Sequence, residues 1–164
     1  MNRIINRFFI AAAAVLLIAS CRPEKFKDIG DPASKTAGIQ ANWILAHAYV
    51  IDEAFATPDK LEITDFYKTK ALPTLNITAT GFTALTTGVV KNYFGTGKGT
   101  WTFDDNTYPT KVYLNYNDNS KDTFMLAGTI RTTDQALKLK KTYYYTKNGV
   151  KKIAYSYIWE FTRQ

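Results

Sequence analysis

The sequence is poor in the residues from which most catalytic and metal sites are built. Its 164 residues include a single Cys, Cys21, and a single His, His47. One Cys excludes a disulfide within the chain, and one Cys with one His excludes a zinc site made of these two residue types alone. No apolar run reaches the roughly 20 residues that a membrane-spanning helix needs. We therefore expect no metal site, no cofactor and no spanning helix.

Sequence patterns typical of enzymes are missing as well. No nucleophile-elbow motif supplies a serine for His47 to activate, and no pair of carboxylates stands out as a general acid and base. A structural, half-buried role for His47 is the simpler interpretation. We assign no catalytic residues and predict that the protein is not an enzyme.

Aromatic side chains are abundant. The chain has eleven Tyr, ten Phe and three Trp, which together make up 15% of it. Hydrophobic residues make up 46% and charged residues 21%, close to ordinary globular usage. This composition excludes wholesale disorder, and the length predicts one domain.

The first twenty residues have the pattern of a secretory leader. A basic start with Arg3 and Arg7 precedes the apolar run 8–18, and small residues then lead to Cys21. Residues 18–21 (IASC) resemble the lipobox of bacterial lipoproteins. The resemblance implies that residues 1–20 are removed and that Cys21 is acylated, with palmitate among its chains. The alternative is an ordinary signal peptide with an incidental Cys.

Residues 21–37 have the composition of a flexible tether that follows the lipidated Cys. Residue 22 is Arg, whereas lipoproteins kept at the inner membrane commonly have Asp there, so the resemblance favours the outer membrane. Lys25 and Lys27 interrupt the acidic residues of the tether, which favours the periplasmic face over the cell surface. We expect a membrane partner through Cys21 and, outside the cytoplasm, no nucleic acid.

From residue 38 onwards the sequence predicts strands joined by short links. Asn148-Gly149 between two alternating strands is a strong type I′ hairpin signal. Within residues 54–70, the segment LEITDFYKT is the only plausible helical stretch. The strand-like segments are 39–53, 73–80, 82–90, 100–104, 111–116, 123–130, 136–146 and 151–163. No link is long enough for a parallel crossover.

These eight segments predict an all-β domain over residues 38–164, an antiparallel up-and-down barrel that removes exposed sheet edges by closing. A two-sheet β-sandwich is the alternative. The domain resembles lipocalin-like domains of bacterial lipoproteins of unknown function, through Trp43, TWTFDDNTYPTKVYL at 100–114 and YSYIWEF at 155–161. True lipocalins have Gly two residues before that Trp, where this chain has Ala41. The resemblance implies that Arg163 packs over Trp43; a frayed, solvated end is the alternative.

The aromatic residues of the last two strands are the candidate ligand site. We predict that six rings face the barrel interior, five from alternation in these strands and Trp43 because its strand must pair with the chain's end when the barrel closes: Trp43, Tyr143, Tyr145, Tyr155, Tyr157 and Trp159. The phenol and indole groups favour a cavity for a small amphipathic or aromatic ligand, and ordinary barrel core is the alternative. Lys141 alternates with these rings, so a bulge, a place at the barrel mouth or an anionic ligand must accommodate its charge.

The sequence thus leaves two functions open. The first is an outer-membrane-anchored lipoprotein whose lipocalin-like barrel binds such a ligand. The second is a structural or interaction lipoprotein whose barrel is filled and whose surface docks an envelope partner.

Overall fold

We describe a computed structural model of the chain, which covers residues 34–54, 57–67, 72–85 and 96–164. The folded unit comprises residues Ala33–Gln164. The predicted leader, the lipidation of Cys21 and most of the predicted tether lie outside the described residues. Among the described residues, no helix has the length and apolarity needed to cross a bilayer.

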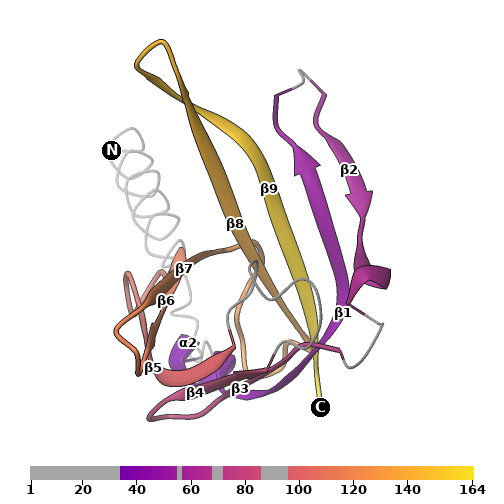
Figure 1. Ribbon diagram of the computed structural model, residues 1–164. Helices are drawn as coiled ribbons and strands as arrows, with labels where there is room; N and C mark the ends of the chain where they lie inside the picture. The colour runs from indigo at the N-terminus through magenta and orange to yellow at the C-terminus, as the bar shows by residue number, and fades with distance from the viewer. Residues whose placement is uncertain (1–33, 55–56, 68–71, 86–95) are drawn as a thin grey trace, which may run out of the picture. The chain divides into compact units, whose positions relative to one another are not determined.

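One antiparallel sheet makes up the fold (Figure 1). Its strands are β1 (Ala41–Asp52), β2 (Asp59–Glu62), β3 (Thr74–Ile77), β4 (Phe82–Leu85), β5 (Gly97–Phe103), β6 (Lys111–Tyr116), β7 (Lys121–Leu126), β8 (Ala136–Lys147) and β9 (Val150–Arg163). Sequential strands from β3 to β9 are neighbours, and β1 pairs with both β3 and β9. Eight strands therefore close into a barrel, and β2 is an additional strand. The up-and-down barrel is confirmed, and the sandwich alternative is not observed.

Short turns with the expected chemistry join β5 to β6, β6 to β7 and β8 to β9. Asn148 and Gly149 have φ values of 54° and 73°, as a type I′ hairpin turn requires. Asn119, between β6 and β7, has a φ of 67°. Asp104 ends β5 by accepting hydrogen bonds from the backbone N–H groups of Thr110 and Lys111, at 2.9 and 2.8 Å. Local sequence therefore determines where the chain reverses.

The helix expected within residues 54–70 is not formed in the part that the structure describes, residues 57–67. Asp59–Glu62 forms β2, which pairs with the second half of β1, and Thr64–Phe66 forms only a 3₁₀ turn. The Ile63 N–H donates to the Ala48 carbonyl at 2.8 Å, and the Ala48 N–H donates to the Thr64 hydroxyl at 2.9 Å. Tertiary bonds to β1 thus replace the local bonds that a helix would use.

The C-terminal part of the predicted tether is ordered. Residues Lys35–Ile39 form helix α2, and the Ser34 hydroxyl caps it by accepting the Ala37 N–H at 3.2 Å. Ile39 is fully buried, and its carbonyl accepts the Trp43 indole N–H at 2.8 Å. The predicted tether of residues 21–37 therefore overlaps the folded part of the chain at α2, whose Ile39 supplies apolar surface to the barrel.

The barrel interior is packed with side chains. The largest fully buried ones are Trp43, Trp159, Tyr67, Phe124, Phe161, Ile39, Leu45, Leu75, Leu114, Leu137 and Leu139. Tyr67, which follows the 3₁₀ turn, accepts the Trp159 indole N–H on its hydroxyl at 2.9 Å. A segment between β2 and β3 thereby fills part of the interior.

The first and last strands close the barrel over nine register pairs, from Trp43–Arg163 to Asp52–Tyr155. The Arg163 guanidinium lies 4.9 Å from the centre of the Trp43 ring and donates to the Gly38 carbonyl at 2.8 Å. The packing that the lipocalin resemblance implies for Arg163 is confirmed, and the frayed alternative is wrong.

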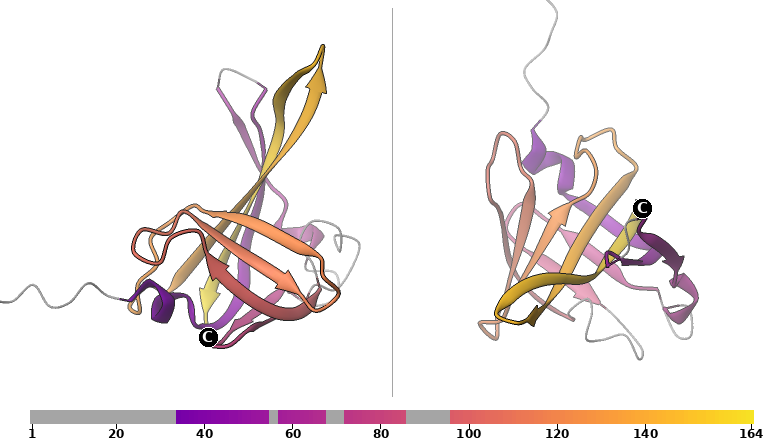
Figure 2. Two further views of the ribbon diagram at one scale, coloured as in Figure 1. Left: turned by 90° about the vertical axis from the view of Figure 1, so that its left-hand side faces the viewer. Right: turned by 90° about the horizontal axis from the view of Figure 1, so that it is seen from above.

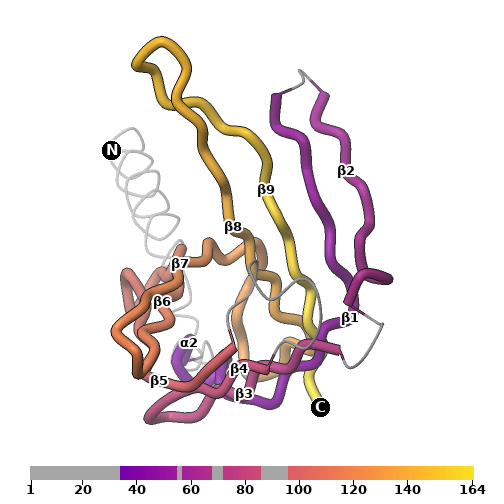
Figure 3. The backbone as a smooth tube through the Cα atoms, in the orientation of Figure 1, coloured from indigo at the N-terminus to yellow at the C-terminus, as the bar shows by residue number. Residues whose placement is uncertain are grey.

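Two hairpins extend beyond the barrel, β1–β2 and β8–β9 (Figure 2). We call the side from which they project the hairpin end of the barrel. Strands β8 and β9 run without a break from the barrel into their hairpin, as the tube view shows (Figure 3). Core and projection are therefore parts of the same two strands.

Candidate functional site

The inward face of β8 and β9 carries a continuous series of aromatic rings. Strand register places Trp159 opposite Leu139, Tyr157 opposite Lys141, and Tyr155 opposite Tyr143. Phe124 of β7 contacts the series from the side, with its ring centre 5.8 Å from that of Trp159. We call these residues, Phe124, Trp159, Tyr157, Tyr143 and Tyr155, the aromatic ladder.

Each ring of the aromatic ladder contacts the next. Trp159 and Tyr157 are stacked with ring centres 5.6 Å apart, and Tyr143 and Tyr155 are stacked at 5.2 Å. Tyr157 meets Tyr143 and Tyr155 edge to face, at 5.7 and 5.5 Å. These are favourable arrangements for aromatic quadrupoles, so the rings hold one another in position.

The aromatic ladder runs from the core to the surface at the hairpin end. Trp159 is fully buried, Tyr157 is 9% exposed and Tyr155 is 37% exposed. Tyr143 is half-buried, and this burial is the main cause that raises its pKa above the ordinary phenol value. The two outer rings, Tyr143 and Tyr155, are only partly buried, so they offer ring faces and hydroxyl groups to a molecule arriving from solvent.

A charged pair lies beside the aromatic ladder. The Lys141 ammonium lies 2.5 Å from an Asp122 carboxylate oxygen, and the Tyr116 hydroxyl donates to the other oxygen at 3.2 Å. The same ammonium is 5.6 Å from the Phe124 ring centre and 5.7 Å from that of Tyr143. Burial, with Asp122 as the second cause, raises the pKa of Tyr116. Lys141 is thus matched by a carboxylate within the chain.

The pairing of Asp122 with Lys141 is not among the predictions from the sequence. Of the three expected solutions for the lysine, a bulge that turns it outward is not used, because Lys141 keeps its inward register opposite Tyr157. Asp122 is the second residue of β7 and, two residues before Phe124, shares the inward face with it. Its alternation with Phe124 is the one sequence signal that would have placed it there.

The six predicted site residues do not come together at one place. Trp43, Tyr157 and Trp159 lie in the barrel interior, as predicted, but Trp43 contacts Arg163 at the opposite end from the hairpins. Tyr143 and Tyr155 lie at the rim of the barrel at its hairpin end, and we call this pair of residues the aromatic rim. The predicted interior position of Tyr145 is wrong: it is 44% exposed and lies on the part of the hairpin that leaves the barrel.

A β-bulge changes the face of the hairpin beyond the rim. Tyr143 pairs with Tyr155 but Tyr144 pairs with Ile153, so Ala154 is the extra residue. Ile153 is therefore opposite Tyr144, on the other face of the ribbon from Tyr155. Bulges of this kind increase local twist and re-aim the side chains that follow them.

Two open surface hollows of about 360 Å³ each lie outside the aromatic ladder. One is lined by Asn76, Thr83 and Lys98 among others, and the second by Gly128, Asp134 and Lys138 among others. Neither is lined by a residue of the aromatic ladder. The aromatic rim is therefore the better candidate for a site that recognises a ring or an apolar group.

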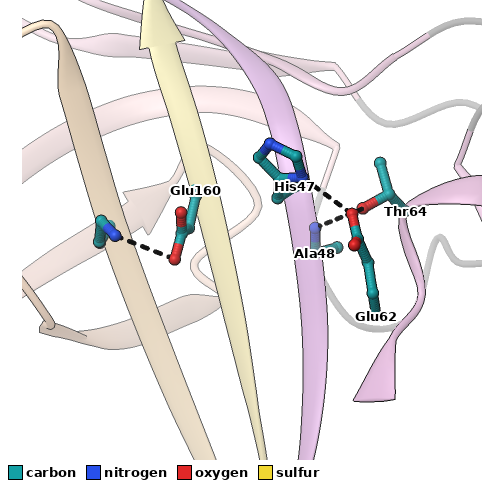
Figure 4. A network of polar contacts seen from close by, with 6 residues as sticks. His47, Ala48, Glu62, Thr64 and Glu160 are labelled. Atoms are coloured by element: carbon teal, nitrogen blue, oxygen red, sulfur yellow. Dashed lines mark hydrogen bonds and ion pairs between the residues drawn. The ribbon is translucent and has the colours of Figure 1, made fainter. Parts of the chain in front are cut away.

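A second polar cluster joins β1 to β2 and the 3₁₀ turn (Figure 4). The His47 Nδ1 atom is 2.8 Å from a Glu62 carboxylate oxygen, to which the Thr64 hydroxyl also donates, at 2.7 Å. The carboxylate lies between the imidazole and the hydroxyl, so His47 is not placed to take the proton of Thr64. The Thr64 oxygen also accepts the Ala48 N–H. This cluster fastens β2 and the 3₁₀ turn to β1.

Metal chemistry finds no support in the described part of the chain. No group of three or more His, Cys, Asp or Glu residues there is arranged to hold a metal ion.

Comparison with family models, curated proteins and solved structures finds no match to this sequence. Functional inference therefore depends on the geometry of the site itself.

Proposed function

We propose that the protein is an outer-membrane lipoprotein whose barrel binds a small amphipathic or aromatic ligand at its hairpin end. The observation that supports ligand binding is the aromatic ladder, which leads from fully buried Trp159 to Tyr155 at the rim. A role as a binding protein is preferred to catalysis because the one imidazole contacts a carboxylate on the outer face. The support for the anchor is the sequence pattern that ends at Cys21.

The ligand contacts the rim in this proposal, because side chains occupy the barrel deeper down. Tyr143 and Tyr155 offer ring faces against which a flat or apolar group stacks. The Lys141–Asp122 pair offers a donor and an acceptor beside those rings. A ligand with one apolar face and a polar edge matches this arrangement.

Calorimetric titration of the full chain tests the ligand site. Phospholipids, bile-acid-like amphiphiles and aromatic glycosides are the three classes to titrate. We expect one class to bind, and Tyr155→Ala to weaken that binding about tenfold through lost stacking. Tyr108→Ala is the matched control, because Tyr108 is 80% exposed and lies in the turn between β5 and β6. An absence of binding by all three classes contradicts the proposal.

A filled barrel that docks an envelope partner is the second candidate function. Its support is the packed interior, together with the exposed apolar residues of the β8–β9 hairpin. Native mass spectrometry of protein purified from its own envelope separates the two candidates. A retained small molecule favours the ligand function, whereas a retained protein favours docking.

The proposed anchor is tested independently of the ligand. Cys21→Ser removes the thiol that would be acylated, so we expect the variant in the soluble fraction and the parent in the membrane fraction. Mass analysis of the mature parent is the second measurement, and residues 1–20 should be absent from it. A variant that stays membrane-bound after a high-salt wash, or a mature chain that keeps the leader, refutes the anchor.

A further inference from the structure

The tip of the β8–β9 hairpin is a two-stranded ribbon that pairs with no further strand among the residues that the structure describes. Pairing of β8 with β7 ends at Lys140, and pairing of β9 with β1 ends at Tyr155. Residues 144–153 therefore pair only with one another, at the end of the β8–β9 hairpin that projects from the barrel in Figures 1 and 2. We call these residues the hairpin tip. A two-stranded ribbon is only marginally stable in water on its own.

Large apolar side chains are concentrated on the hairpin tip. Tyr144 is 51% exposed and Val150 is 57% exposed, and Tyr145 and Ile153 are exposed as well. Isolated exposed apolar residues are ordinary on soluble proteins, but a group of them marks an interaction site. The tip therefore fits a partner that removes these side chains from water.

The charge of the hairpin is of one sign. Between Asp134 and Glu160 the sequence contains six lysines and no acidic residue. Three of these lysines, Lys147, Lys151 and Lys152, belong to the tip and are exposed. The Lys151 ammonium lies 4.2 Å from the centre of the Tyr144 ring. A surface with these charges is complementary to an anionic partner.

Both faces of the ribbon carry this combination of groups. On one face of the ribbon, Tyr145 pairs with Lys152 and Lys147 pairs with Val150. On the opposite face, Tyr144 pairs with Ile153 and Thr146 pairs with Lys151. A protein groove would contact one face and leave the other in water. The headgroup region of a bilayer surrounds an inserted tip on both faces, and it accommodates tyrosine rings and lysine ammonium groups together.

We propose that the hairpin tip inserts into the headgroup region of a membrane that contains anionic phospholipid. The boundary between headgroups and acyl chains receives four side chains of the tip, those of Tyr144, Tyr145, Val150 and Ile153. The three lysines of the tip pair with lipid phosphates. This contact requires neither the ligand at the aromatic rim nor acylation of Cys21. It is a second, reversible membrane contact that depends on lipid composition.

A fluorescent reporter placed on the tip tests this proposal. The full chain carries Cys21→Ser, so that Thr146→Cys provides the only thiol for an environment-sensitive fluorophore. Vesicles of phosphatidylglycerol and phosphatidylcholine, and vesicles of phosphatidylcholine alone, are added at low and high salt. We expect a blue shift with the anionic vesicles at low salt, and little change with neutral vesicles or at high salt.

Matched controls separate the tip from the rest of the molecule. A label at Thr107→Cys, in the exposed turn between β5 and β6, should not respond. The triple variant Lys147→Gln/Lys151→Gln/Lys152→Gln should weaken vesicle binding at least tenfold. The triple variant Lys98→Gln/Lys111→Gln/Lys121→Gln loses the same charge from the barrel strands and should retain most of the binding.

Several results would overturn the proposal. The most direct is a label at residue 146 that does not respond to anionic vesicles. This measurement leaves the apolar and charged residues of the tip unchanged. The proposal is also overturned if the labels at residues 146 and 107 respond equally, or if the two triple variants lose vesicle binding to the same extent. A response to single-stranded oligonucleotide in place of vesicles assigns the tip to nucleic acid. Calorimetric binding at the aromatic rim is identified by its loss in Tyr155→Ala, and binding at the tip by its loss in the tip lysine variant, so either proposal can fail without the other.

Discussion

Lys141 shows how one carboxylate allows a charge to lie among aromatic rings. Its ion pair with Asp122 leaves the two side chains 24% and 18% exposed. We predict that Lys141→Met lowers the free energy of unfolding by about 1 to 3 kcal/mol, because Asp122 is left partly buried without its cation. Denaturant unfolding of the two single variants and the double variant Lys141→Met/Asp122→Asn measures the coupling.

Lys138 on the same strand is the matched control. It pairs with Glu160 on the outer face at 3.0 Å, and its side chain is 41% exposed. Lys138→Met should therefore cost less than about 1 kcal/mol, as exposed ion pairs do. Equal losses for the two lysines would show that the Lys141 pair contributes no more than a surface ion pair.

Asp104 links one turn to pH. Its carboxylate accepts the Thr110 hydroxyl and the Thr110 and Lys111 N–H groups, and these bonds hold its pKa well below the usual range. A lowered folded-state pKa adds stability above the unfolded value of about 3.9, and that stability is lost as the pH falls below it. We predict that Asp104→Asn lowers the thermal midpoint by a few degrees at pH 7. The difference from the parent should shrink as the pH falls from 4 towards 2.

A pH series of thermal unfolding curves is the measurement for Asp104. A midpoint difference that stays constant over this range would show that the charge of Asp104 is not the source of its contribution. A difference that grows as the pH falls would contradict the direction of the pKa shift.

At the scale of elements, a close contact between β5 and β6 requires glycine at position 99. A Cβ atom there would overlap the Asn115 carbonyl oxygen of β6, which is backbone and cannot move aside. We predict that Gly99→Ala lowers the free energy of unfolding by about 2 kcal/mol or more, because the two strands must separate. Gly128→Ala is the matched control, since its Cβ would meet only the flexible Lys138 side chain at 3.7 Å.

Denaturant unfolding of the two glycine variants decides this prediction. Gly128→Ala should be nearly neutral. If Gly99→Ala were equally neutral, strands β5 and β6 could move apart to admit the Cβ atom without loss of stability, and the prediction would be wrong.

Most elements were predictable from the sequence because their signals are local. Alternation and turn residues gave the strands of the barrel, and Asn148-Gly149 forms the predicted turn. The segment Asp59–Glu62 was not predicted as a strand, because its pairing partner on β1 makes it one. The bulge at Ala154 was also missed, since alternation assumes an uninterrupted register.

At the scale of the whole molecule, Arg163 connects both ends of the folded unit. It stacks on Trp43 of the first strand, donates to the Gly38 carbonyl of α2, and belongs to the last strand. We predict that Arg163→Met lowers the free energy of unfolding by about 1 to 3 kcal/mol through loss of the stacked cation and the hydrogen bond. Arg131→Met, at an exposed position, should change it by less than about 0.5 kcal/mol.

Chemical denaturation of the two arginine variants provides the comparison. If Arg163→Met and Arg131→Met had equal small effects, the contacts of Arg163 would not contribute to barrel closure.

The candidate site was only partly predictable, because it depends on how far each strand extends past the barrel. Alternation identified Tyr143, Tyr155, Tyr157 and Trp159 as neighbours on one face, and the structure brings these four together. The sequence does not mark the point at which β8 loses β7 as a neighbour, so Tyr145 was placed inside. The contact between Lys141 and Asp122 is a tertiary pairing between strands that no local spacing reveals.

The closing pair of strands also has a mechanical direction. Strand β1 starts beside α2, and β9 starts at the hairpin tip, so the two run in opposite directions over nine register pairs. Hydrogen bonds in an antiparallel pair lie across the strands. Tension between the tip and the start of β1 therefore pulls along both strands and loads these pairs in shear, all at once. Peeling from one end would break them in succession, so the barrel should resist this particular direction of pull most strongly.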